Sequence, residues 1–308
     1  CALVDALERG EAPDQVEGIA FLRDGAFVAT PRRKRIRDLD ALPWPAWDLF
    51  DVRAYYAQGH VLGVDTGMTM PILATRGCPY DCTFCSSSGM WGREWLARTP
   101  ERVVDEIEAY HRDYGARNFP FHDLTAVLRR DWIARFCEAL LARGLDVTWQ
   151  LPSGTRCEVI DAGLAHLMRR SGCSSVTFAA ESGSARTRAL IGKRLDEATL
   201  MRAVRAAVGC GMNVSCFFVA GFPHDTRADL NASVRLAARL ARNGVNDIAL
   251  SAFFPIPNTA LFHQLRDAGR LELSDQTLLA PVFSMNARMS EQYNYCAHLS
   301  AAQLTRLK

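Results

Sequence analysis

Strand-like and helix-like segments alternate along the chain from about residue 68, and this alternation constrains the fold more than any other feature of the sequence. Most helical segments are followed by a glycine just before the next strand, which is the usual chemistry of a short loop from a helix to a strand. Units of this kind in series imply a parallel sheet with the helices outside it. The strands are expected at residues 70–75, 118–122, 147–151, 175–179, 213–219 and 247–251.

The helices of these units have recognisable ends. Thr99 is expected to cap a helix that has Pro100 in its first turn and ends by Gly115. Because six strand–helix units are fewer than the eight of a closed barrel, the predicted fold is α/β, an open, partial (β/α)6 TIM-like barrel with parallel strands and outer helices. Ligands should gather at the carboxyl ends of the strands. Further helices are expected at residues 130–143, 163–170, 197–208 and 227–242.

Composition and charge narrow the possible functions. Of the 308 residues, 49% are hydrophobic and 23% are charged, which is typical of a globular protein and excludes disordered, collagen-like and coiled-coil chains. The net charge of +2 provides no overall field that would attract nucleic acid or a membrane surface. The apolar runs are strand-sized, and the N-terminal segment lacks a signal-peptide pattern. We therefore expect a cytoplasmic protein with reduced cysteines, no membrane span and no nucleic-acid partner.

The chain is expected to have three parts. They are a tail and linker from a missing upstream domain (1–60), the core barrel (61–272) and the start of a C-terminal extension (273–308). The first part contains a hairpin turn signal at Asp24-Gly25 and a basic run at 31–37, which we interpret as a solvated linker. We expect a fragment of a longer protein, because the chain begins with Cys1 instead of Met.

Three of the ten cysteines lie close together, directly after the first expected strand. Cys78, Cys82 and Cys85 have the spacing CxxxCxxC, with turn-forming residues between them that keep the segment a loop. Three thiolates this close can bind one [4Fe-4S] cluster and leave its fourth iron free for another ligand. A structural zinc site would need a fourth Cys or His at pair spacing, and a redox CxxC pair would leave Cys78 unexplained. The spacing favours an iron–sulfur cluster, with zinc as the alternative.

This loop, after the first strand of a six-unit barrel, resembles the radical S-adenosylmethionine (radical SAM) superfamily. The resemblance implies that Cys78, Cys82 and Cys85 hold a [4Fe-4S] cluster whose unique iron binds the amino and carboxylate groups of SAM. It also implies that one-electron reduction cleaves SAM to a 5′-deoxyadenosyl radical, which abstracts hydrogen from a small-molecule substrate. The electron would come from a donor such as flavodoxin or ferredoxin. The protein itself would orient the cofactor and shield the radical.

Flanking segments resemble the cobalamin-binding branch of the superfamily, which includes anaerobic magnesium-protoporphyrin monomethyl ester cyclase-like proteins and radical methyltransferases. These segments are residues 90–95 (Met-Trp-Gly-Arg-Glu-Trp), 98–101 (Arg-Thr-Pro-Glu) and the linker at 38–47. The chain has no Asp-x-His-x-x-Gly motif to ligate cobalamin. The resemblance therefore implies cobalamin as a cofactor that the missing upstream domain would hold.

The resemblance also implies residues that bind SAM. Glu181 and Ser182, after the fourth strand, match the family segment that contacts the ribose and methionine of SAM. Asp123 stands where the branch commonly has paired acids. Arg156 could reach the SAM carboxylate, or it could simply pair with Glu158.

Other residues receive structural interpretations. Ser184 belongs either to the SAM segment or to the N-cap of a following helix. The strand aromatics expected in the core, and not in a pocket, are Trp149, Phe178, Phe217 and Phe218. The isolated cysteines expected to be small buried side chains are Cys137, Cys157, Cys173, Cys210 and Cys216.

The resemblance implies an enzyme, either a transferase or an oxidoreductase. The favoured reaction is cobalamin-dependent methyl transfer to an unreactive centre after reductive cleavage of SAM. An oxidative cyclisation of the magnesium-protoporphyrin ester type is the alternative within the branch. A non-catalytic zinc-binding interaction module is the alternative of another class. No catalytic residue is assigned beyond the cluster.

Overall fold

A computed structural model describes residues 2–284 and 291–306. The chain divides into two compact units, Cys1–Leu39 and Asp40–Lys308. The expected boundary near residue 60 stays a prediction, and Cys1 lies outside the described residues. The elements of the smaller unit are α1 (Ala2–Glu8), a 3-10 turn (Pro13–Gln15), β1 (Ala20–Arg23) and β2 (Ala26–Ala29).

The smaller unit contains the predicted hairpin. Strands β1 and β2 pair antiparallel, with Arg23 opposite Ala26 next to the turn. Asp24 and Gly25 form that turn with positive φ angles of 49° and 79°. Glycine and aspartate tolerate this left-handed backbone better than most residues, which is why the dipeptide predicts the turn from sequence.

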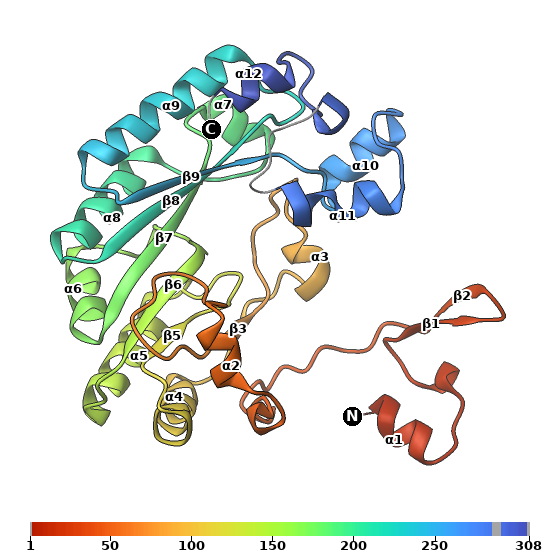
Figure 1. The fold of residues 1–308 in the computed structure, drawn as a ribbon, viewed down its shortest axis with the longest axis vertical. Coiled ribbons are helices and arrows are strands. Elements are labelled where there is room, and N and C mark those ends of the chain that lie inside the picture. Colours follow the sequence, from red (N-terminus) through yellow and green to blue (C-terminus); the bar gives the residue numbers. More distant parts are fainter. Residues whose placement is uncertain (1, 285–290, 307–308) are drawn as a thin grey trace. The chain divides into compact units, whose positions relative to one another are not determined.

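The larger unit is built around one parallel sheet, which confirms the predicted α/β class. Its five strands are hydrogen-bonded in chain order, and every neighbouring pair is parallel (Figure 1). They correspond to five of the six expected strands, each within a few residues of its expected position. The strands are β5 (Asn118–Pro120), β6 (Thr148–Thr155), β7 (Cys173–Glu181), β8 (Asn213–Ala220) and β9 (Asp247–Ala252).

The first expected strand, at residues 70–75, is only partly formed. The N–H of Met70 donates to the Asn118 carbonyl at 3.0 Å, and the N–H of His122 donates to the Ile72 carbonyl at 2.8 Å. Pro120 lies between Asn118 and His122 and has no N–H, so the ladder lacks a bond at this position. The segment is therefore joined to β5 by isolated bridges and not by a continuous ladder.

Five helices cover one face of the sheet (Figure 1), and they confirm the expected helices. Gly115 and Gly144 follow the first two helices in the left-handed region, with φ of 69° and 62°. Thr99 occupies the expected N-cap position, but its side chain makes no capping bond, and its own N–H donates to the Asp40 carboxylate at 3.1 Å. The helices are α4 (Pro100–Tyr114), α5 (Arg130–Arg143), α6 (Ala162–Arg170), α8 (Glu197–Gly209) and α9 (Arg227–Arg242).

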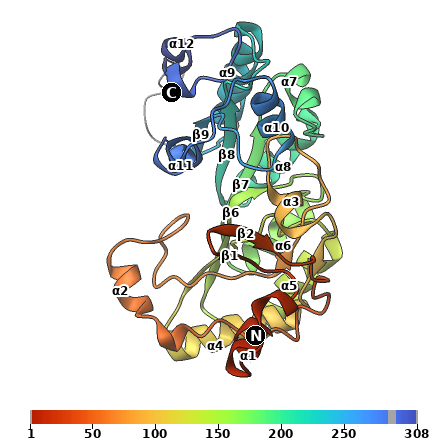
Figure 2. The same ribbon diagram turned by 90° about the vertical axis from the view of Figure 1, so that its right-hand side faces the viewer.

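The remaining elements of the larger unit are short and belong to the segments that connect or flank the strands and helices named above. Helix α12 begins at the Ser300 capping box and lies beside α9, where Leu304 and Leu230 share an apolar cluster with Cys296 (Figure 2). These elements are α2 (Val52–Ala57), β3 (Thr75–Arg76), α3 (Ser87–Trp91), β4 (Leu96–Ala97), α7 (Ala185–Leu190), α10 (Ala260–Asp267), α11 (Asp275–Ser284), α12 (Ala301–Thr305) and 3-10 turns at Trp47–Leu49 and Glu291–Tyr293.

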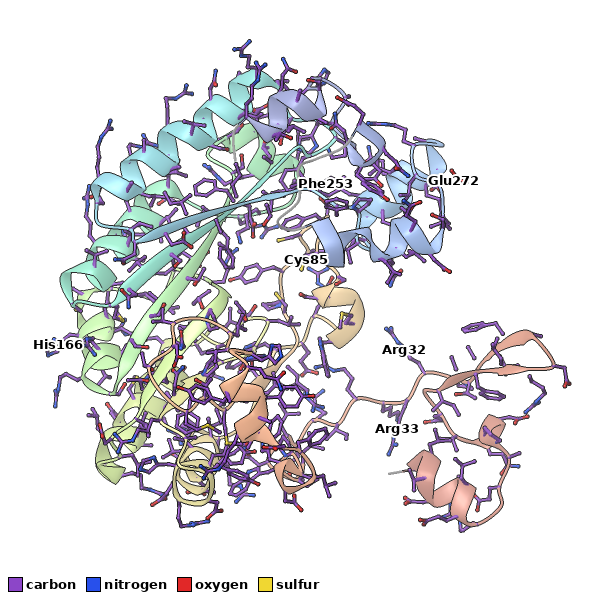
Figure 3. The ribbon with its side chains drawn as sticks, viewed as in Figure 1. Arg32, Arg33, Cys85, His166, Phe253 and Glu272 are labelled. Atoms are coloured by element: carbon purple, nitrogen blue, oxygen red, sulfur yellow. The ribbon has the colours of Figure 1, made fainter. Side chains whose placement is uncertain are left out.

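Two apolar clusters organise the larger unit. The main core includes the fully buried Trp149, and it confirms Phe178 and Phe218 as core residues. A second cluster contains Phe222 and Phe253, which follow β8 and β9. Figure 3 shows Cys85 and Phe253 on the inner side of the sheet, whereas His166 lies on the outer helix layer. The cysteine loop thus lies on the face of the sheet opposite the helices.

The isolated cysteines are mostly core residues, as expected. Cys137, Cys157, Cys173 and Cys216 are buried, whereas Cys210 is half-buried, and all nine described cysteines are free thiols. Burial raises the pKa of the Cys137 thiol to about 12, so this group stays protonated. Within the described residues, no helix has the length and hydropathy needed to cross a membrane.

Candidate active site

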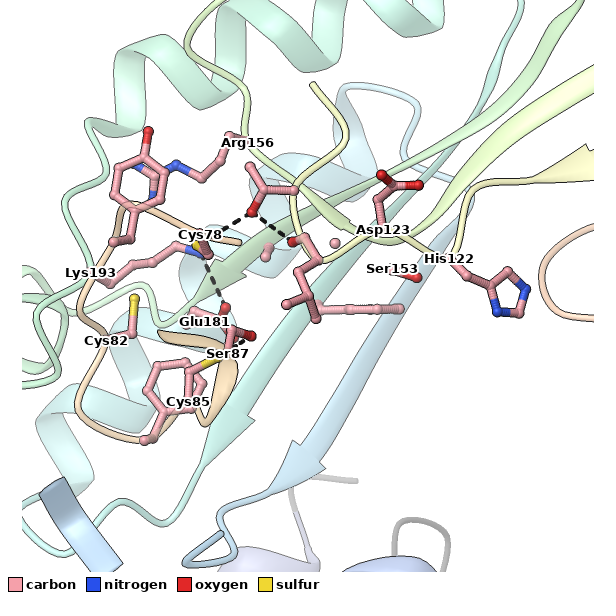
Figure 4. A pocket seen from close by; sticks show the side chains of 17 residues that line it. Cys78, Cys82, Cys85, Ser87, His122, Asp123, Ser153, Arg156, Glu181 and Lys193 are labelled. Carbon is pink, nitrogen blue, oxygen red and sulfur yellow. Dashed lines mark hydrogen bonds and ion pairs between the residues drawn. The ribbon is translucent and has the colours of Figure 1, made fainter. Parts of the chain in front are cut away.

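A pocket of the larger unit is lined by the cysteine loop, by residues that follow β5, and by residues in or just after the carboxyl-terminal halves of β6, β7 and β8. Figure 4 shows the three cysteine side chains on one side of this pocket and His122 on the other. Their sulfur atoms belong to half-buried residues, so they are open to a ligand in the pocket. The site therefore lies at the carboxyl ends of the strands, where the barrel prediction expects it.

The cysteine loop is held by backbone hydrogen bonds to three separate segments. Cys78 N–H donates to Gly92 at 3.2 Å, and Thr83 N–H donates to Ile191 at 3.0 Å. The carbonyl of Thr83 accepts from Leu261 N–H at 3.0 Å. The loop thus has a defined shape although it contains no strand or helix between Cys78 and Cys85.

The approach of residue 192 to the cysteine loop requires glycine. Gly192 has a φ of 69°, and a Cβ atom there would lie 2.9 Å from the carbonyl oxygen of Asp81. A side chain would be strained both by this backbone angle and by the contact. The glycine therefore lets the loop and the segment after α7 pack together, which brings Lys193 into the pocket.

Lys193 forms an ion pair with Glu181 in the pocket wall, and sequence reasoning missed this lysine. The Lys193 Nζ to Glu181 Oε1 distance is 3.1 Å, and the two side chains are 6% and 12% exposed. Glu181 ends β7 with a positive φ of 60°, an unusual angle for a residue with a side chain. The sequence signal that could have pointed to Lys193 is the glycine directly before it, because a glycine after a short helix often marks a tight turn.

Electrostatics around Cys82 also involve this lysine. Burial raises the pKa of the Cys82 thiol to about 11, and the positive charge of Lys193 acts against that shift. Only the thiolate binds metal well. A cation beside this sulfur therefore favours the form that a cluster requires.

Asp123 lies in the pocket wall, but its oxygens already bind the chain. Its Oδ1 accepts from Thr75 N–H and from Thr75 Oγ1, both at 2.5 Å, and its Oδ2 accepts from Ala74 N–H at 3.1 Å. Burial raises the pKa of this carboxyl to about 6, although these hydrogen bonds oppose the rise. Asp123 thus anchors the start of the cysteine loop, and its predicted contact with SAM stays a prediction.

Arg156 lines the pocket and also forms the structural pair considered from sequence. Its guanidinium pairs with Glu158 and donates to the Arg194 carbonyl at 2.6 Å. It also lies over the Tyr80 ring, 3.8 Å from the centroid. These contacts hold the guanidinium at the pocket edge. The pairing with Glu158 is confirmed, and the contact with SAM stays a prediction.

Within the segment 181–184, only Glu181 faces this pocket. Ser182 is buried, and its hydroxyl lies 3.2 Å from Ser233 Oγ while accepting from Ser184 N–H at 3.1 Å. A Cβ atom on Gly183 would lie 2.3 Å from the Ala232 carbonyl oxygen, so glycine is needed where this turn meets α9. These contacts do not support the predicted role of Ser182 in SAM binding, which stays a prediction.

Ser184 and Phe217 complete the comparison with the sequence predictions. Ser184 is the N-cap of α7, where its hydroxyl accepts from Thr187 N–H at 3.2 Å. The prediction that Phe217 is a core residue is wrong, because Phe217 lines the pocket. Neighbouring strand residues point to opposite faces, so the buried Phe218 places Phe217 on the other side. The sequence signal was that Phe217 and Phe218 are adjacent in one strand, so only one of them could face the core.

The residues present fit an iron–sulfur cluster. Within residues 2–284 and 291–306, no three side chains of His, Cys, Asp or Glu converge closely enough for one metal ion. A [4Fe-4S] cluster differs from a single ion, because each thiolate binds its own iron atom. Three thiols along one pocket wall therefore match the donor chemistry of the cluster, with room beside them lined by Arg156 and Glu181.

Comparisons with known proteins support this assignment. The model of the radical SAM superfamily matches residues 72–237, which include the cysteine loop and the strands β5 to β8. An uncharacterized methyltransferase of Pyrococcus horikoshii is 31% identical over 297 residues, covering 94% of this chain and 61% of the relative. The anaerobic magnesium-protoporphyrin IX monomethyl ester cyclase of Cereibacter sphaeroides is 29% identical, covering 90% of this chain and 44% of the relative.

Solved structures agree on the fold. The radical SAM methyltransferase TsrM from Kitasatospora setae has a TM-score of 0.70 at 17% identity, covering 87% of this chain and 52% of that one. The chain spans only about half of the length of these proteins. The resemblance seen in the sequence is confirmed, and so is the partial barrel. The chain belongs to the radical SAM superfamily, a family of enzymes that use a [4Fe-4S] cluster and SAM.

Proposed function

We propose that this chain is the radical SAM core of a methyltransferase. Cys78, Cys82 and Cys85 would hold the [4Fe-4S] cluster, and the pocket beside them would hold SAM. The observation that carries the proposal is the grouping of three half-buried thiols with the Glu181–Lys193 ion pair in one pocket. The 31% identity with a methyltransferase over 94% of the chain supports the reaction class.

Each side of the pocket has a chemical role in this proposal. When bound, the cluster supplies the electron that cleaves SAM to a 5′-deoxyadenosyl radical. Arg156 offers a fixed fork of N–H donors, which suits the carboxylate of SAM. Glu181, which pairs with Lys193, is able to accept hydrogen bonds from ribose hydroxyls. Phe84 and Phe217 line the same pocket and help to exclude water from it.

The cofactor and partner proposals extend beyond the chain. We infer that cobalamin takes part and is held outside residues 1–308, because the chain spans about half of its relatives and has no cobalamin ligand motif. TsrM has been solved with cobalamin and a [4Fe-4S] cluster bound. A small-molecule substrate, an electron donor of the flavodoxin or ferredoxin class and a cytoplasmic location complete the proposal. The nine cysteines that the structure describes are all free, which is consistent with a reducing compartment.

An oxidative cyclase is the second candidate, and one observation favours it. The anaerobic magnesium-protoporphyrin IX monomethyl ester cyclase is 29% identical over 90% of the chain. SAM labelled in its methyl group separates the two reactions, because label enters the product of a methyltransferase and not that of a cyclase. This assay requires the longer protein.

The core proposal is tested on the chain itself. The chain is purified without oxygen and reconstituted, and iron, sulfide, zinc and 5′-deoxyadenosine are measured after reduction with dithionite. We expect about four irons per chain and SAM cleavage, with both lost in Cys82→Ala. Cys210→Ala is the matched control, because Cys210 is half-buried at the end of α8 and does not line the pocket. A colourless protein with bound zinc and no iron would instead support the zinc-binding module.

A further inference from the structure

Two of the three cysteine sulfurs have a hydroxyl group at hydrogen-bonding distance. Thr125 Oγ1 lies 3.4 Å from Cys78 Sγ, and Ser87 Oγ lies 3.0 Å from Cys85 Sγ. Dashed lines mark both contacts in Figure 4. The third sulfur, of Cys82, lies instead in the field of the Lys193 ammonium. Each sulfur thus has its own polar neighbour, supplied by a different part of the chain.

The direction of both hydrogen bonds follows from the chemistry of a ligating sulfur. A thiolate carries no hydrogen and only accepts, so each hydroxyl must be the donor once the sulfur binds iron. The Thr125 hydroxyl also reaches the Leu124 carbonyl, at 2.7 Å, and it has only one hydrogen to share. A charged acceptor forms the stronger bond, so we expect the hydrogen to turn to Cys78 when the cluster is present.

Thr125 is held in place by its neighbours. It is 4% exposed, and its carbonyl accepts from Trp95 Nε1 at 2.9 Å, while Thr75 Oγ1 lies 3.4 Å from the same carbonyl oxygen. Thr75 is in turn held by the Asp123 carboxylate. The bond from Trp95 and the burial of Thr125 therefore fix its backbone, and its hydroxyl lies within reach of Cys78 Sγ. A hydrogen bond in such a buried place is stronger than one in water.

Ser87 is placed by the chain that leaves the cysteine loop. It is the first residue of α3, only two residues after Cys85, so the fold of this turn determines where its hydroxyl lies. Ser86, one residue earlier, directs its hydroxyl elsewhere, 3.6 Å from Met90 Sδ. Two adjacent serines in the same turn thus differ in whether they reach a cluster sulfur.

We propose that Thr125 and Ser87 are positioning residues that raise the reduction potential of the cluster held by Cys78, Cys82 and Cys85. Hydrogen bonds to ligating sulfurs are a known determinant of iron–sulfur potentials. They stabilise the reduced cluster more than the oxidised one, because reduction adds negative charge that the sulfurs share. The inference rests on the proposed function, since it requires that these cysteines bind the cluster.

The redox step itself is simple. One electron passes from a low-potential one-electron donor to the [4Fe-4S]²⁺ cluster and yields [4Fe-4S]⁺, while the donor is oxidised by one electron. No bond is formed or broken on the two hydroxyl groups, and their protons stay on oxygen. In the experiment, dithionite replaces the protein donor.

The test is a redox titration of the reconstituted chain, followed by electron paramagnetic resonance of the reduced cluster. We expect Thr125→Val and Ser87→Ala each to make the midpoint potential more negative. For the double variant we expect about a tenfold loss in the equilibrium constant for reduction, which equals about 59 mV for a one-electron couple. Thr125→Ser keeps a hydroxyl and should restore the wild-type midpoint. Ser86→Ala is the matched control for Ser87→Ala and should leave the midpoint unchanged.

Iron and sulfide content separate the possible failures. If the wild-type chain takes up no iron, the proposed function fails. If all variants bind four irons at the wild-type midpoint potential, the tuning role is overturned while the proposed function stands. If Thr125→Val folds poorly, the half-buried Ser87 still carries the test, because its side chain is small and lies at a helix start. A shift in Ser86→Ala as large as that in Ser87→Ala also overturns the proposal.

Discussion

At the scale of single residues, the Glu181–Lys193 ion pair places two opposite charges in the wall of the pocket. Both groups are largely removed from water, at 12% and 6% exposure, so each depends on the other for compensation. Asp123 is a contrasting case, because its oxygens accept three hydrogen bonds, and within residues 2–284 and 291–306 no ion pair to it is found.

Lys193→Met should leave the Glu181 carboxylate buried and unpaired. We expect the free energy of unfolding of the cluster-free chain to fall by about 3 kcal/mol in urea denaturation. The double variant Lys193→Met/Glu181→Gln should recover most of this loss, because neither charge remains. A single variant as stable as the wild type would contradict the role of the pair.

Asp123 predicts a specific dependence of stability on pH. Its carboxyl has a pKa of about 6 in the folded chain against an ordinary value of 3.8, so the folded state binds more protons between these values. The proton bound by Asp123 therefore stabilises the folded chain by about 3 kcal/mol below about pH 4. This contribution to the unfolding free energy is lost as the pH rises through 6. Asp123→Asn does not titrate, and its unfolding free energy should lack this component of the fall between pH 4 and 6. Parallel pH profiles of the two proteins would rule this out.

At the scale of elements, glycines and prolines explain where regular structure stops. Pro120 interrupts the ladder between β5 and the segment before the cysteine loop, so that the first expected strand is reduced to isolated bridges. The strand–helix order, the helix ends at Gly115 and Gly144, and the cysteine loop after the first strand were all predictable from sequence. The sequence did not predict which segment each loop packs against, because hydrogen bonds such as that from Thr83 N–H to the Ile191 carbonyl join segments far apart in the chain.

Gly192→Ala should test the contact between the cysteine loop and the segment after α7. We expect a loss of about 2–3 kcal/mol in unfolding free energy together with reduced iron uptake, since the strained φ and the contact with Asp81 both oppose a side chain. Gly211→Ala is the matched control, because Gly211 has a φ of 74° but nothing within 4 Å of the added Cβ atom. It should lose only about 1 kcal/mol and keep its iron. Equal losses in the two variants would show that the contact has no effect.

At the scale of the whole molecule, every residue that lines the pocket belongs to the unit Asp40–Lys308. A chain that lacks residues 1–39 should therefore bind the same amount of iron as the complete chain. Iron analysis of both reconstituted chains provides the measurement. A loss of iron binding on removal of 1–39 would show that the smaller unit contributes to the site.

The sequence by itself determined the α/β class, the order of strands and helices, the cysteine motif and the family. These are local properties, because periodicity, turn residues and ligand spacing are recorded within a few neighbouring positions. The family resemblance also named Glu181, Arg156 and Asp123 as site residues, and all three line the pocket. Only the tertiary structure decided which further side chains share the pocket with the cysteines. It brought in Lys193, Thr125 and Phe217, while Asp123 became an anchor of the cysteine loop. The physical reason is that such contacts depend on how distant segments pack against one another, and a single sequence does not record those distances.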